Sequence, residues 1–460
     1  MKRNFLLLII MGLFCFTSRA QFSVVYNFLP LGSDSGYSPE GTLYYDGTYL
    51  YGTAGGGTDT VGVVYRIKPD GSAYSVLHNF SWTDGARPQQ HNVFTSDGTY
   101  LYGMTGYGGA HDSGIVYRIK PDGSAFTDLH DFTGKDGKLP TGGLIFVGAY
   151  LYGMTELGGT SGDGVLFRIK PDGSGDTVLH NFSGPDGKEP LETLFYDGTY
   201  LYGTADGGTH GVVFRIKPDG TGDTVLHNFI NTDGNGPSST LILVGGYLYG
   251  TALHGGKYSY GVVFRIKPDG TGDTVLHNFN KTDGSGPFSS LFYDGTYLYG
   301  ITIGGGSYDQ GEIYRINPDG SGDTVLYSID TTNDCTPQGG LIKIGSYFYG
   351  TGSLGGTHNG GVIFKYGDTI TGINELTNAN EVRVYPNPFD GKFTIESSVV
   401  SGQSSVEIYN VLGEQIAKSQ WPLANSRMQI DLSDKPTGIY FYRIISEKGD
   451  FIASGKLIKE

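Results

Sequence analysis

Cysteine is nearly absent from this chain of 460 residues, which contains only Cys15 and Cys335. Cys15 lies in an apolar N-terminal segment that we expect to be removed, so Cys335 would remain alone in the mature chain. A disulfide within that chain is therefore excluded. Because the sequence indicates no histidine partner for Cys335, we interpret it as an incidental residue and not as a nucleophile.

Charge is also scarce. Charged residues make up 17% of the sequence, no run of basic residues occurs, and the formal net charge is −15. Electrostatic attraction to nucleic acid or to anionic lipid is therefore not expected. In contrast, the chain has 77 glycines and 34 tyrosines, and 13% of its residues are aromatic. These residues favour turns and strands, so the composition predicts an all-β fold.

One long apolar run is present, at the N-terminus. Met1-Lys2-Arg3-Asn4 precede "FLLLIIMGLFCF", and "TSRA" follows before Gln21. A charged start, an apolar stretch and small residues at the end are the features of a secretory signal peptide. The stretch is shorter than the roughly 20 residues that a membrane-spanning helix needs. We expect residues 1–20 to be a signal peptide that is cleaved after Ala20.

A repeat of about 50 residues fills most of the chain. The motif Tyr-Leu-Tyr-Gly or a close variant starts at Tyr49, Tyr100, Tyr150, Tyr200, Tyr247, Tyr297 and Tyr347. Each copy has four strand-like runs, with hairpin turns at Asp-Gly-Thr and Lys-Pro-Asp-Gly. Seven four-stranded units of this length predict a seven-bladed β-propeller. A linear β-solenoid is the alternative, but its coils usually have shorter periods and its open ends need caps.

The two ends of the repeat array support a closed ring. The seventh copy stops at Asp368, before its Pro-Asp-Gly turn and fourth strand. A matching fourth strand, Phe22–Phe28 or "FSVVYNF", stands instead before the first copy. Pairing of this N-terminal strand with the seventh blade would cover both free sheet edges. We therefore predict that residues 22–366 form a propeller closed by its N-terminal strand.

The repeats resemble a known family of glycine-rich tandem repeats. The resemblance covers about Phe22 to Tyr366 and rests on "GVVFRIKPDG". The family is the Gloeo-Verruco (GloVer) repeats of bacterial surface proteins. It implies a surface protein but no reaction.

Several polar residues recur in nearly every copy, and we interpret them as structural. A histidine of the fourth strand recurs at His78, His130, His180, His227 and His277. Tyrosine replaces it in two copies, and one histidine per blade is too few for a metal site, so no metal or other cofactor is expected. An arginine of the third strand, such as Arg66, is expected to pair with a repeated acid. The aspartate of each "DG..P" link is expected to bond its own backbone rather than calcium.

Ligand recognition is expected where the copies differ. The loops between second and third strands vary and are glycine-rich and polar. The residues that depart most from the repeat are Tyr107, Glu156, Asp206, His254 and Tyr258. Aromatic rings among small polar groups suit a glycan or a peptide. Glu156 and Asp206 occupy equivalent positions in successive copies and are the candidate catalytic pair, because two carboxylates can hydrolyse a glycosidic bond at a suitable separation.

The last residues follow a different pattern. A polar segment at 367–381 is expected to be a linker, and short alternating strands in 382–460 predict a small β-sandwich. This end resembles the type A C-terminal sorting domain of the type IX secretion system of Bacteroidota. The matching residues are Tyr385, Pro386, Asn387, Pro388, Phe389, Gly438 and Lys456. The resemblance implies export through the periplasm and across the outer membrane by the type IX machinery, followed by release or surface attachment.

Three classes of function are compatible with these features. The first is a secreted or cell-surface binding protein without catalysis, with a glycan or protein ligand. The second is a secreted hydrolase or lyase that acts on polysaccharide, and the third is a structural surface-layer protein. An acidic carboxylate pair in a deep pocket would favour the enzyme, and a shallow aromatic rim would favour binding.

Overall fold

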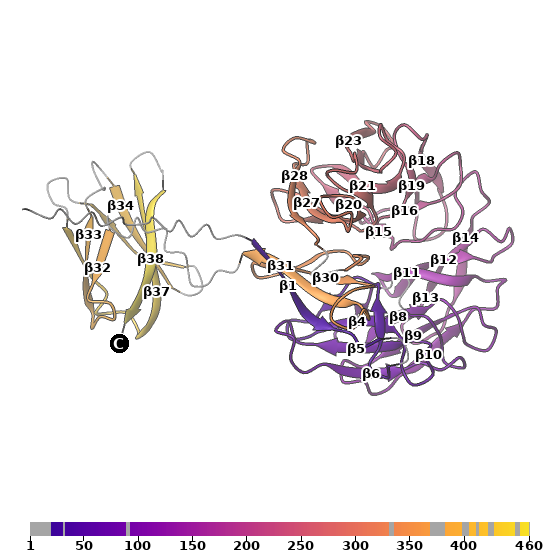
Figure 1. Ribbon diagram of the computed structural model, residues 1–460, viewed down its shortest axis with the longest axis horizontal. Coiled ribbons are helices and arrows are strands. Elements are labelled where there is room, and N and C mark those ends of the chain that lie inside the picture. The colour runs from indigo at the N-terminus through magenta and orange to yellow at the C-terminus, as the bar shows by residue number, and fades with distance from the viewer. Residues whose placement is uncertain are drawn as a thin grey trace, which may run out of the picture. The chain divides into compact units, whose positions relative to one another are not determined.

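The computed structural model describes residues 20–30, 33–88, 93–330, 335–368, 382–397, 404–410, 414–421, 427–446 and 451–459. All regular elements among them are strands, which confirms the predicted all-β class. They belong to two compact units, one at Ala20–Asp368 and one within Thr369–Glu460 (Figure 1). The predicted signal peptide lies outside the described residues except for Ala20.

The first unit consists of seven small antiparallel sheets, numbered here in chain order. Sheet 1 contains β2 (Tyr37–Pro39), β3 (Tyr44–Tyr45), β4 (Leu50–Gly55), β5 (Val63–Ile67) and β6 (Ser75–Asn79). Sheet 2 contains β7 (Thr95–Ser96), β8 (Leu101–Thr105), β9 (Ile115–Ile119) and β10 (Thr127–Asp131). Sheet 3 contains β11 (Lys138–Val147), β12 (Tyr150–Leu157), β13 (Val165–Ile169) and β14 (Thr177–Asn181). Sheet 4 contains β15 (Phe195–Tyr196), β16 (Leu201–Ala205), β17 (Val212–Ile216) and β18 (Thr224–Asn228).

The remaining sheets of this unit follow the same plan. Sheet 5 contains β19 (Asn235–Pro237), β20 (Ile242–Val244), β21 (Tyr247–His254), β22 (Val262–Ile266) and β23 (Thr274–Asn278). Sheet 6 contains β24 (Ser285–Pro287), β25 (Phe292–Tyr293), β26 (Leu298–Gly304), β27 (Glu312–Ile316) and β28 (Thr324–Ser328). Sheet 7 contains β29 (Ile342–Ile344), β30 (Tyr347–Gly352) and β31 (Val362–Asp368), and β1 (Ala20–Asn27) is its outer strand.

The N-terminal strand completes sheet 7. β1 pairs antiparallel with β31, with Phe22 opposite Tyr366 and Asn27 opposite Val362. The prediction that this strand supplies the missing fourth strand of the seventh repeat is therefore confirmed. The pairing joins residues that are separated by almost the whole unit.

The repeated glycine of Tyr-Leu-Tyr-Gly has a packing role. In sheet 5 it is Gly250 of β21, which lies opposite Phe264 of β22. A methyl group on Gly250 would lie 2.7 Å from Cζ of Phe264, closer than any side chain tolerates. The glycine therefore leaves room for a buried aromatic ring in the next strand, and this accounts for the motif in every copy.

Hydrophobic clusters join each sheet to the next. One cluster contains Tyr51 of sheet 1 with Tyr117 of sheet 2, and equivalent clusters follow through to sheets 6 and 7. A further cluster contains Leu50 of sheet 1 and Tyr349 of sheet 7. The apolar contacts therefore form a cycle that returns from the last sheet to the first.

The repeated arginine corrects one prediction. It was expected to pair with an acid, but Nη1 of Arg66 donates to the carbonyl of Pro121 in the next sheet, at 2.8 Å. The guanidinium lies 4.6 Å from the centre of the Tyr49 ring in its own sheet. A backbone oxygen and a ring face offer the cation partners without a second charge that would have to be desolvated.

The C-terminal unit has two sheets. One contains β32 (Val382–Tyr385), β33 (Lys392–Ser397) and β36 (Arg427–Asp431). The other contains β34 (Ser404–Asn410), β35 (Gln415–Gln420), β37 (Gly438–Ser446) and β38 (Phe451–Lys459). A single hydrophobic cluster contains Phe393 and Ile430 of the first sheet and Val406 and Ile444 of the second. The two sheets therefore share one core.

Candidate functional site

The two ends of the repeated sheets differ in chemistry. At one end, which we call the hairpin rim, lie the turns between first and second and between third and fourth strands. Oδ1 of Asp46 accepts the backbone N–H groups of Thr48 and Tyr49, each at 2.7 Å, and Oδ2 accepts the Tyr51 hydroxyl at 2.8 Å. The same pattern recurs at Asp97, Asp197 and Asp294. The first hairpins of sheets 3, 5 and 7 lack this aspartate and turn instead at Gly148, Gly245 and Gly345, each with a positive φ.

The opposite end, which we call the loop rim, carries the loops between second and third strands and the links between sheets. Of the predicted ligand residues there, Tyr107 is partly buried beneath the Arg87 guanidinium, 5.0 Å from the ring centre. His254 is exposed at the end of β21. Tyr258 is 45% exposed, with Nζ of Lys257 4.9 Å from its ring centre. The three residues are thus available to solvent to different degrees.

A group of three carboxylates lies on the loop rim. Glu156 is near the end of β12, and Asp206 directly follows β16. Glu189 comes from the link between sheets 3 and 4, where the backbone N–H of Lys188 donates to the carbonyl of Asp206 at 2.6 Å. The Lys188 ammonium lies 3.5 Å from Oε1 of Glu189.

The pKa values of the two predicted carboxyls, Glu156 and Asp206, are raised in part by neighbouring carboxylates. Burial raises the pKa of Glu156, and the negative charges of Glu189 and Asp206 raise it further. Burial and Glu189 raise the pKa of Asp206, while Lys188 and His254 act in the opposite direction. The structure thus brings Glu156, Asp206 and His254 into one electrostatic neighbourhood. Groups of this kind can accept hydrogen bonds from hydroxyls, bind a cation or exchange a proton.

Glu189 was missed in the sequence because it stands in a "DG..P" link, which was interpreted only as a turn. The sequence did contain a sign of it. The residue directly before the link proline is an acid at Glu189, whereas other copies have Arg87, Leu139 and Gly236 there. A positive φ of 48° at Glu189 places its backbone in the left-handed region. A link residue can therefore contribute to a site as directly as a loop residue does.

Short segments beside the first strands of sheets 1, 2, 4, 5, 6 and 7 line a narrow cavity. Its volume is about 20 Å³, enough for roughly one water molecule. The lining residues are Glu40, Thr42, Val93, Glu192, Thr240, Phe288, Ser289, Ser290, Gln338 and Gly340. Burial raises the pKa of Glu192 well above its usual range. The cavity is too small for a sugar or a peptide.

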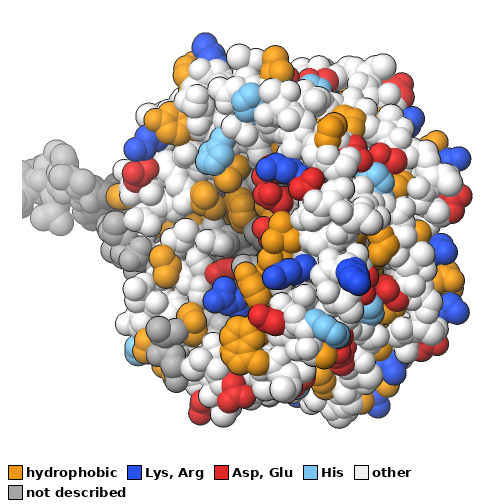
Figure 2. Space-filling view, turned by 90° about the vertical axis from the view of Figure 1, so that its right-hand side faces the viewer, with side chains coloured by type: hydrophobic (Ala, Val, Ile, Leu, Met, Phe, Trp, Pro, Cys, Tyr) orange, Lys and Arg blue, Asp and Glu red, His pale blue; other side chains and the backbone are white. Residues whose placement is uncertain are grey.

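Figure 2 shows one face of the protein. Acidic, basic and hydrophobic side chains are interspersed over it, and the surface is hollowed near the middle of the view. On a surface of this kind, recognition depends on a few well-placed side chains rather than on a broad field of one sign.

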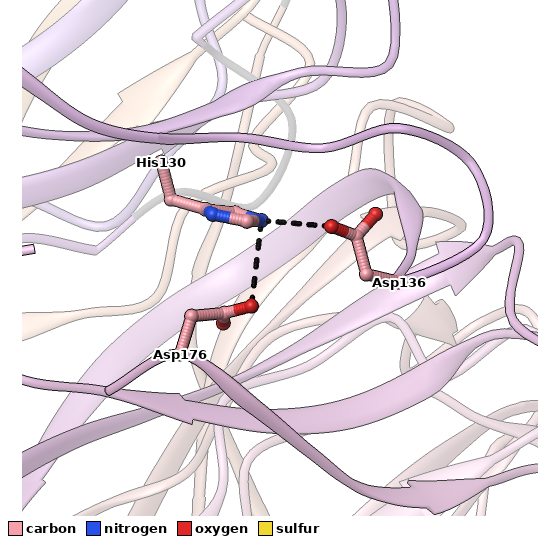
Figure 3. Close-up of side chains that lie close together, drawn as sticks. All are labelled: His130, Asp136 and Asp176. Carbon is pink, nitrogen blue, oxygen red and sulfur yellow. Dashed lines mark ion pairs between the residues drawn. The ribbon is translucent and has the colours of Figure 1, made fainter. Parts of the chain in front are cut away.

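The repeated histidines lie in a second type of polar cluster, between neighbouring sheets. Nε2 of His130 is 3.2 Å from Oδ2 of Asp136 and 3.8 Å from Oδ2 of Asp176 (Figure 3). Asp136 belongs to the link after sheet 2, and Asp176 precedes the outer strand of sheet 3. Equivalent groups are His180–Asp186–Asp223, His227–Asp233–Asp273 and His277–Asp283–Asp323. One imidazole and two carboxylates are donors that a divalent metal accepts.

Three other interfaces replace the second carboxylate with a ring. His78 stacks on Phe126 with centroids 3.8 Å apart, and Tyr26 stacks on Tyr74 at 4.2 Å. Tyr327 stacks on Phe22 of β1 at 4.9 Å. Because flat rings occupy this position throughout, we interpret it as a contact between sheets, and the histidine–aspartate groups as its ionic form.

Replacing the second aspartate of these groups by asparagine is expected to flatten the pH dependence of stability. These residues are Asp176, Asp223, Asp273 and Asp323. Burial raises the pKa of each, against the opposing effect of the histidine. The folded chain then binds the proton more tightly, so the free energy of unfolding falls as pH rises from about 3.9 to the raised pKa. Asparagine removes that fall, which urea unfolding at several pH values measures.

Asp122→Asn is the matched control. Hydrogen bonds from Ser124 lower the pKa of the exposed Asp122 carboxyl. Its stabilising contribution is present above the ordinary aspartate pKa and is lost as pH falls, so this variant should alter the pH dependence in the opposite sense. Identical profiles for Asp122→Asn and Asp176→Asn would contradict the proposed role of burial.

The motif of the C-terminal unit holds its last strand. Nδ2 of Asn387 donates to the carbonyl of Lys456, and its Oδ1 accepts the N–H of Ile458, each at 2.8 Å. The Phe389 ring is buried in the core, and the backbone N–H of Phe389 donates to the Ile458 carbonyl. Gly438 starts β37, opposite Lys459. Tyr385, Pro386 and Pro388 are exposed. Four of the predicted sorting residues therefore belong to β38 or contact it: Asn387, Phe389, Gly438 and Lys456.

The repeats and the C-terminal unit together define an exported repeat protein. The model of the Gloeobacter/Verrucomicrobia repeat matches residues 12–211 and 206–387, and the chain belongs to that family. The model of the secretion system C-terminal sorting domain matches residues 383–460. The chain therefore carries a type IX sorting domain, which directs it through the type IX machinery to the cell surface or to secretion. No helix in the described part of the chain could span a membrane.

Solved structures with a similar fold are distant. The extracellular domain of the putative one-component system BT4673 from B. thetaiotaomicron is 13% identical with a TM-score of 0.49; the match covers 95% of this chain and 58% of that one. A fungal alcohol oxidase of the AA5 family, in complex with copper, is 11% identical with a TM-score of 0.49 and coverages of 94% and 100%.

A putative 6-phosphogluconolactonase from Bacteroides uniformis is 15% identical, with a TM-score of 0.44 and coverages of 67% and 88%. This chain spans less than two thirds of the length of the BT4673 extracellular domain. No curated protein matches it. These structures carry no information about its activity.

Proposed function

We propose that residues 22–366 form a seven-bladed β-propeller, between a signal peptide at 1–20 and a linker at 367–381 that leads to a β-sandwich at 382–460. The cycle of hydrophobic clusters from sheet 7 back to sheet 1 supports ring closure. Hydrogen bonds add to it: Oγ1 of Thr141 donates to the Pro190 carbonyl of the next sheet at 3.1 Å, and Oγ1 of Thr351 in sheet 7 donates to the Gly41 carbonyl at 3.0 Å.

We further propose that the protein is a secreted or surface-displayed binding protein without catalysis, whose loop rim recognises a glycan or a protein. The observation that supports this is the asymmetry between the two rims. Identical blades would offer seven identical weak sites, whereas the group of Glu156, Glu189 and Asp206 with His254 occurs once. Partly buried carboxylates accept hydrogen bonds from sugar hydroxyls or from peptide N–H groups.

A polysaccharide hydrolase or lyase is the second candidate. It is favoured by the raised pKa of both Glu156 and Asp206, because a general acid must hold its proton near neutral pH. A glycan array with the purified protein, followed by analysis of any bound glycan for cleavage products, separates the two proposals. Binding without products supports the first, and products that disappear in Glu156→Gln support the second.

Alanine substitutions on the loop rim are expected to weaken binding of a partner found in this way. We expect a loss of about 1–3 kcal/mol at the residues that anchor the ligand, with little change in stability. The residues to replace are Tyr107, Glu156, Asp206, His254 and Tyr258. Binding is measured by calorimetry and stability by thermal unfolding.

Matched substitutions on the hairpin rim should do the reverse. Gly71 and Gly173 have φ of 87° and 88°, and a Cβ on them would lie 2.6 Å from the Val25 carbonyl oxygen and 2.9 Å from that of Leu129. Gly71→Ala and Gly173→Ala should therefore lower stability without weakening binding. A partner whose affinity depends on the hairpin turns and not on the loop residues would overturn the assignment of the rim.

A further inference from the structure

A cavity of about 500 Å³ lies between sheets 6 and 7. It is lined by Tyr299, Arg315, Leu326, Lys343, Gly345, Ser346, Phe348, Tyr366 and Gly367. Gly345 and Ser346 form the first hairpin turn of sheet 7, so the cavity is on the hairpin rim, away from the loop residues considered above. Its volume is within the range of small-molecule sites.

The cavity lies beside the place where sheet 7 lacks its second hairpin. This hairpin is missing because the outer strand of sheet 7 is β1, from the N-terminus. At five other interfaces an arginine donates to the proline carbonyl of the Pro-Asp-Gly hairpin in the next sheet. These pairs are Arg66–Pro121, Arg118–Pro171, Arg168–Pro218, Arg215–Pro268 and Arg265–Pro318. In sheet 7 the third strand pairs with β1, and the sequence after Lys365 reads Tyr-Gly-Asp without a proline. Arg315 therefore faces a sheet that has no equivalent proline carbonyl.

The seventh repeat departs from the other six at three residues of this cavity. Tyr366 replaces an isoleucine, found as Ile67, Ile119, Ile169, Ile216, Ile266 and Ile316. Phe348 replaces a leucine, found as Leu50, Leu101, Leu151, Leu201, Leu248 and Leu298. Lys343 stands where the others have Tyr45, Ser96, Phe146, Tyr196, Leu243 and Tyr293. Two larger rings and a cation thus surround the space of the missing hairpin.

The lining combines ring faces with positive charge. Nζ of Lys343 is 5.2 Å from the centre of the Phe348 ring and 5.8 Å from that of Tyr299. It is 3.5 Å from Oδ2 of Asp294, which also accepts the Tyr299 hydroxyl. Asp294 is therefore the partner of Lys343, and Arg315, 4.5 Å from the centre of the Tyr297 ring, adds a second cation to the lining. An anionic ligand can pair with both cations.

We propose that this cavity binds a sugar acid, that is, a pyranose ring that bears a carboxylate, as in the uronic acid residues of acidic polysaccharides. The carboxylate pairs with Arg315 and Lys343. The apolar face of the sugar packs on the aromatic rings, and its hydroxyls bond to Ser346 and Asp294. This ligand class combines a hydroxylated ring with an anion, as the lining requires, and an exported protein meets it outside the cell.

The test is calorimetric titration of the full chain with digalacturonic acid, compared with the neutral disaccharide of galactose. We expect binding of the acid that weakens at high salt, and no binding of the neutral sugar. Lys343→Tyr introduces the residue of three other repeats, so the variant should fold, and we expect it to lose about tenfold or more in affinity. Phe348→Leu and Tyr366→Ile restore the repeat residues and should also weaken binding.

Lys267→Tyr is the matched control, since Lys267 lies on the same rim, 5.8 Å from the Tyr247 ring centre, and the variant has the same net charge. Its affinity should equal that of the unmodified chain. The proposal is overturned if the acid shows no binding up to about 10 mM. It is also overturned if Lys343→Tyr binds as well as Lys267→Tyr, or if the neutral sugar binds equally. If the acid binds only after residues 369–460 are removed, those residues and not a sugar acid would be the occupant of the cavity in the full chain. This result would also contradict the proposal.

Discussion

Deletion of Phe22–Phe28 is expected to lower the free energy of unfolding by about 5 kcal/mol or more. The segment supplies the outer strand of sheet 7 and two nearly fully buried rings, Phe22 at 7% and Phe28 at 0% exposure. The Phe28 ring packs edge-on against Tyr65 of sheet 1 with centroids 5.2 Å apart. The deletion therefore removes burial at the junction of the last and first sheets and exposes the edge of β31. Urea unfolding followed by circular dichroism measures the loss.

The reference is the chain without residues 1–20, which differs from the variant only by Phe22–Phe28. A finer variant, Phe28→Ala, leaves the strand in place and should cost about 3–5 kcal/mol from the lost ring alone. An unchanged unfolding midpoint in the chain that lacks Phe22–Phe28 would contradict the closed ring.

The strands and the pairing of β1 could be predicted because both depend on local patterns. Asp-Gly-Thr and Lys-Pro-Asp-Gly turns determine which runs become neighbours, and they do so within each copy. The absence of a fourth strand after Asp368 and its presence at Phe22 can be counted directly in the sequence. The seventh copy was the one without a fourth strand, so the N-terminal strand could be predicted to pair with it.

Contacts between copies could not be predicted in the same way. The arginine was expected to pair with an acid, but the nearest acceptor is the carbonyl of Pro121, which no side-chain pattern reveals. The histidine–aspartate groups were missed because each histidine meets an aspartate of the next copy, as His180 meets Asp223, although its own copy contains Asp176 at the equivalent position. Sequence periodicity shows which residues recur in each copy. Which residues of two neighbouring copies come into contact depends on how their sheets pack.

The candidate sites differ in the same respect. Glu156 and Asp206 were identified because they break the repeat at equivalent positions, and the structure adds Glu189 from a link between them. The cavity beside Lys343 was not predicted, although both its causes are visible in the sequence. Lys343 and Phe348 stand 20 residues or more before the place of the missing hairpin, whereas Tyr366 is beside it, and only the pairing of β1 with β31 makes them one feature.

Removal of residues 382–460 is expected to abolish surface display and leave a folded first unit in the periplasm. The two units have separate hydrophobic cores, so loss of the second should not unfold the first. The removed residues carry the sorting domain, whose model matches residues 383–460. Protease accessibility on intact cells of the native host measures display, and urea unfolding of the purified fragment measures its stability.

Asn387→Ala is a sharper version of the same experiment. It removes two hydrogen bonds that hold Lys456 and Ile458 of the last strand and leaves every other residue in place. At about 0.5–1.5 kcal/mol for each hydrogen bond, the loss should total about 1–3 kcal/mol, so the C-terminal unit should be destabilised and display reduced, with the first unit unchanged. Asn410→Ala, at a turn of the same unit, provides the control for general destabilisation. Normal surface display of the chain that lacks residues 382–460 would show that the export address lies elsewhere.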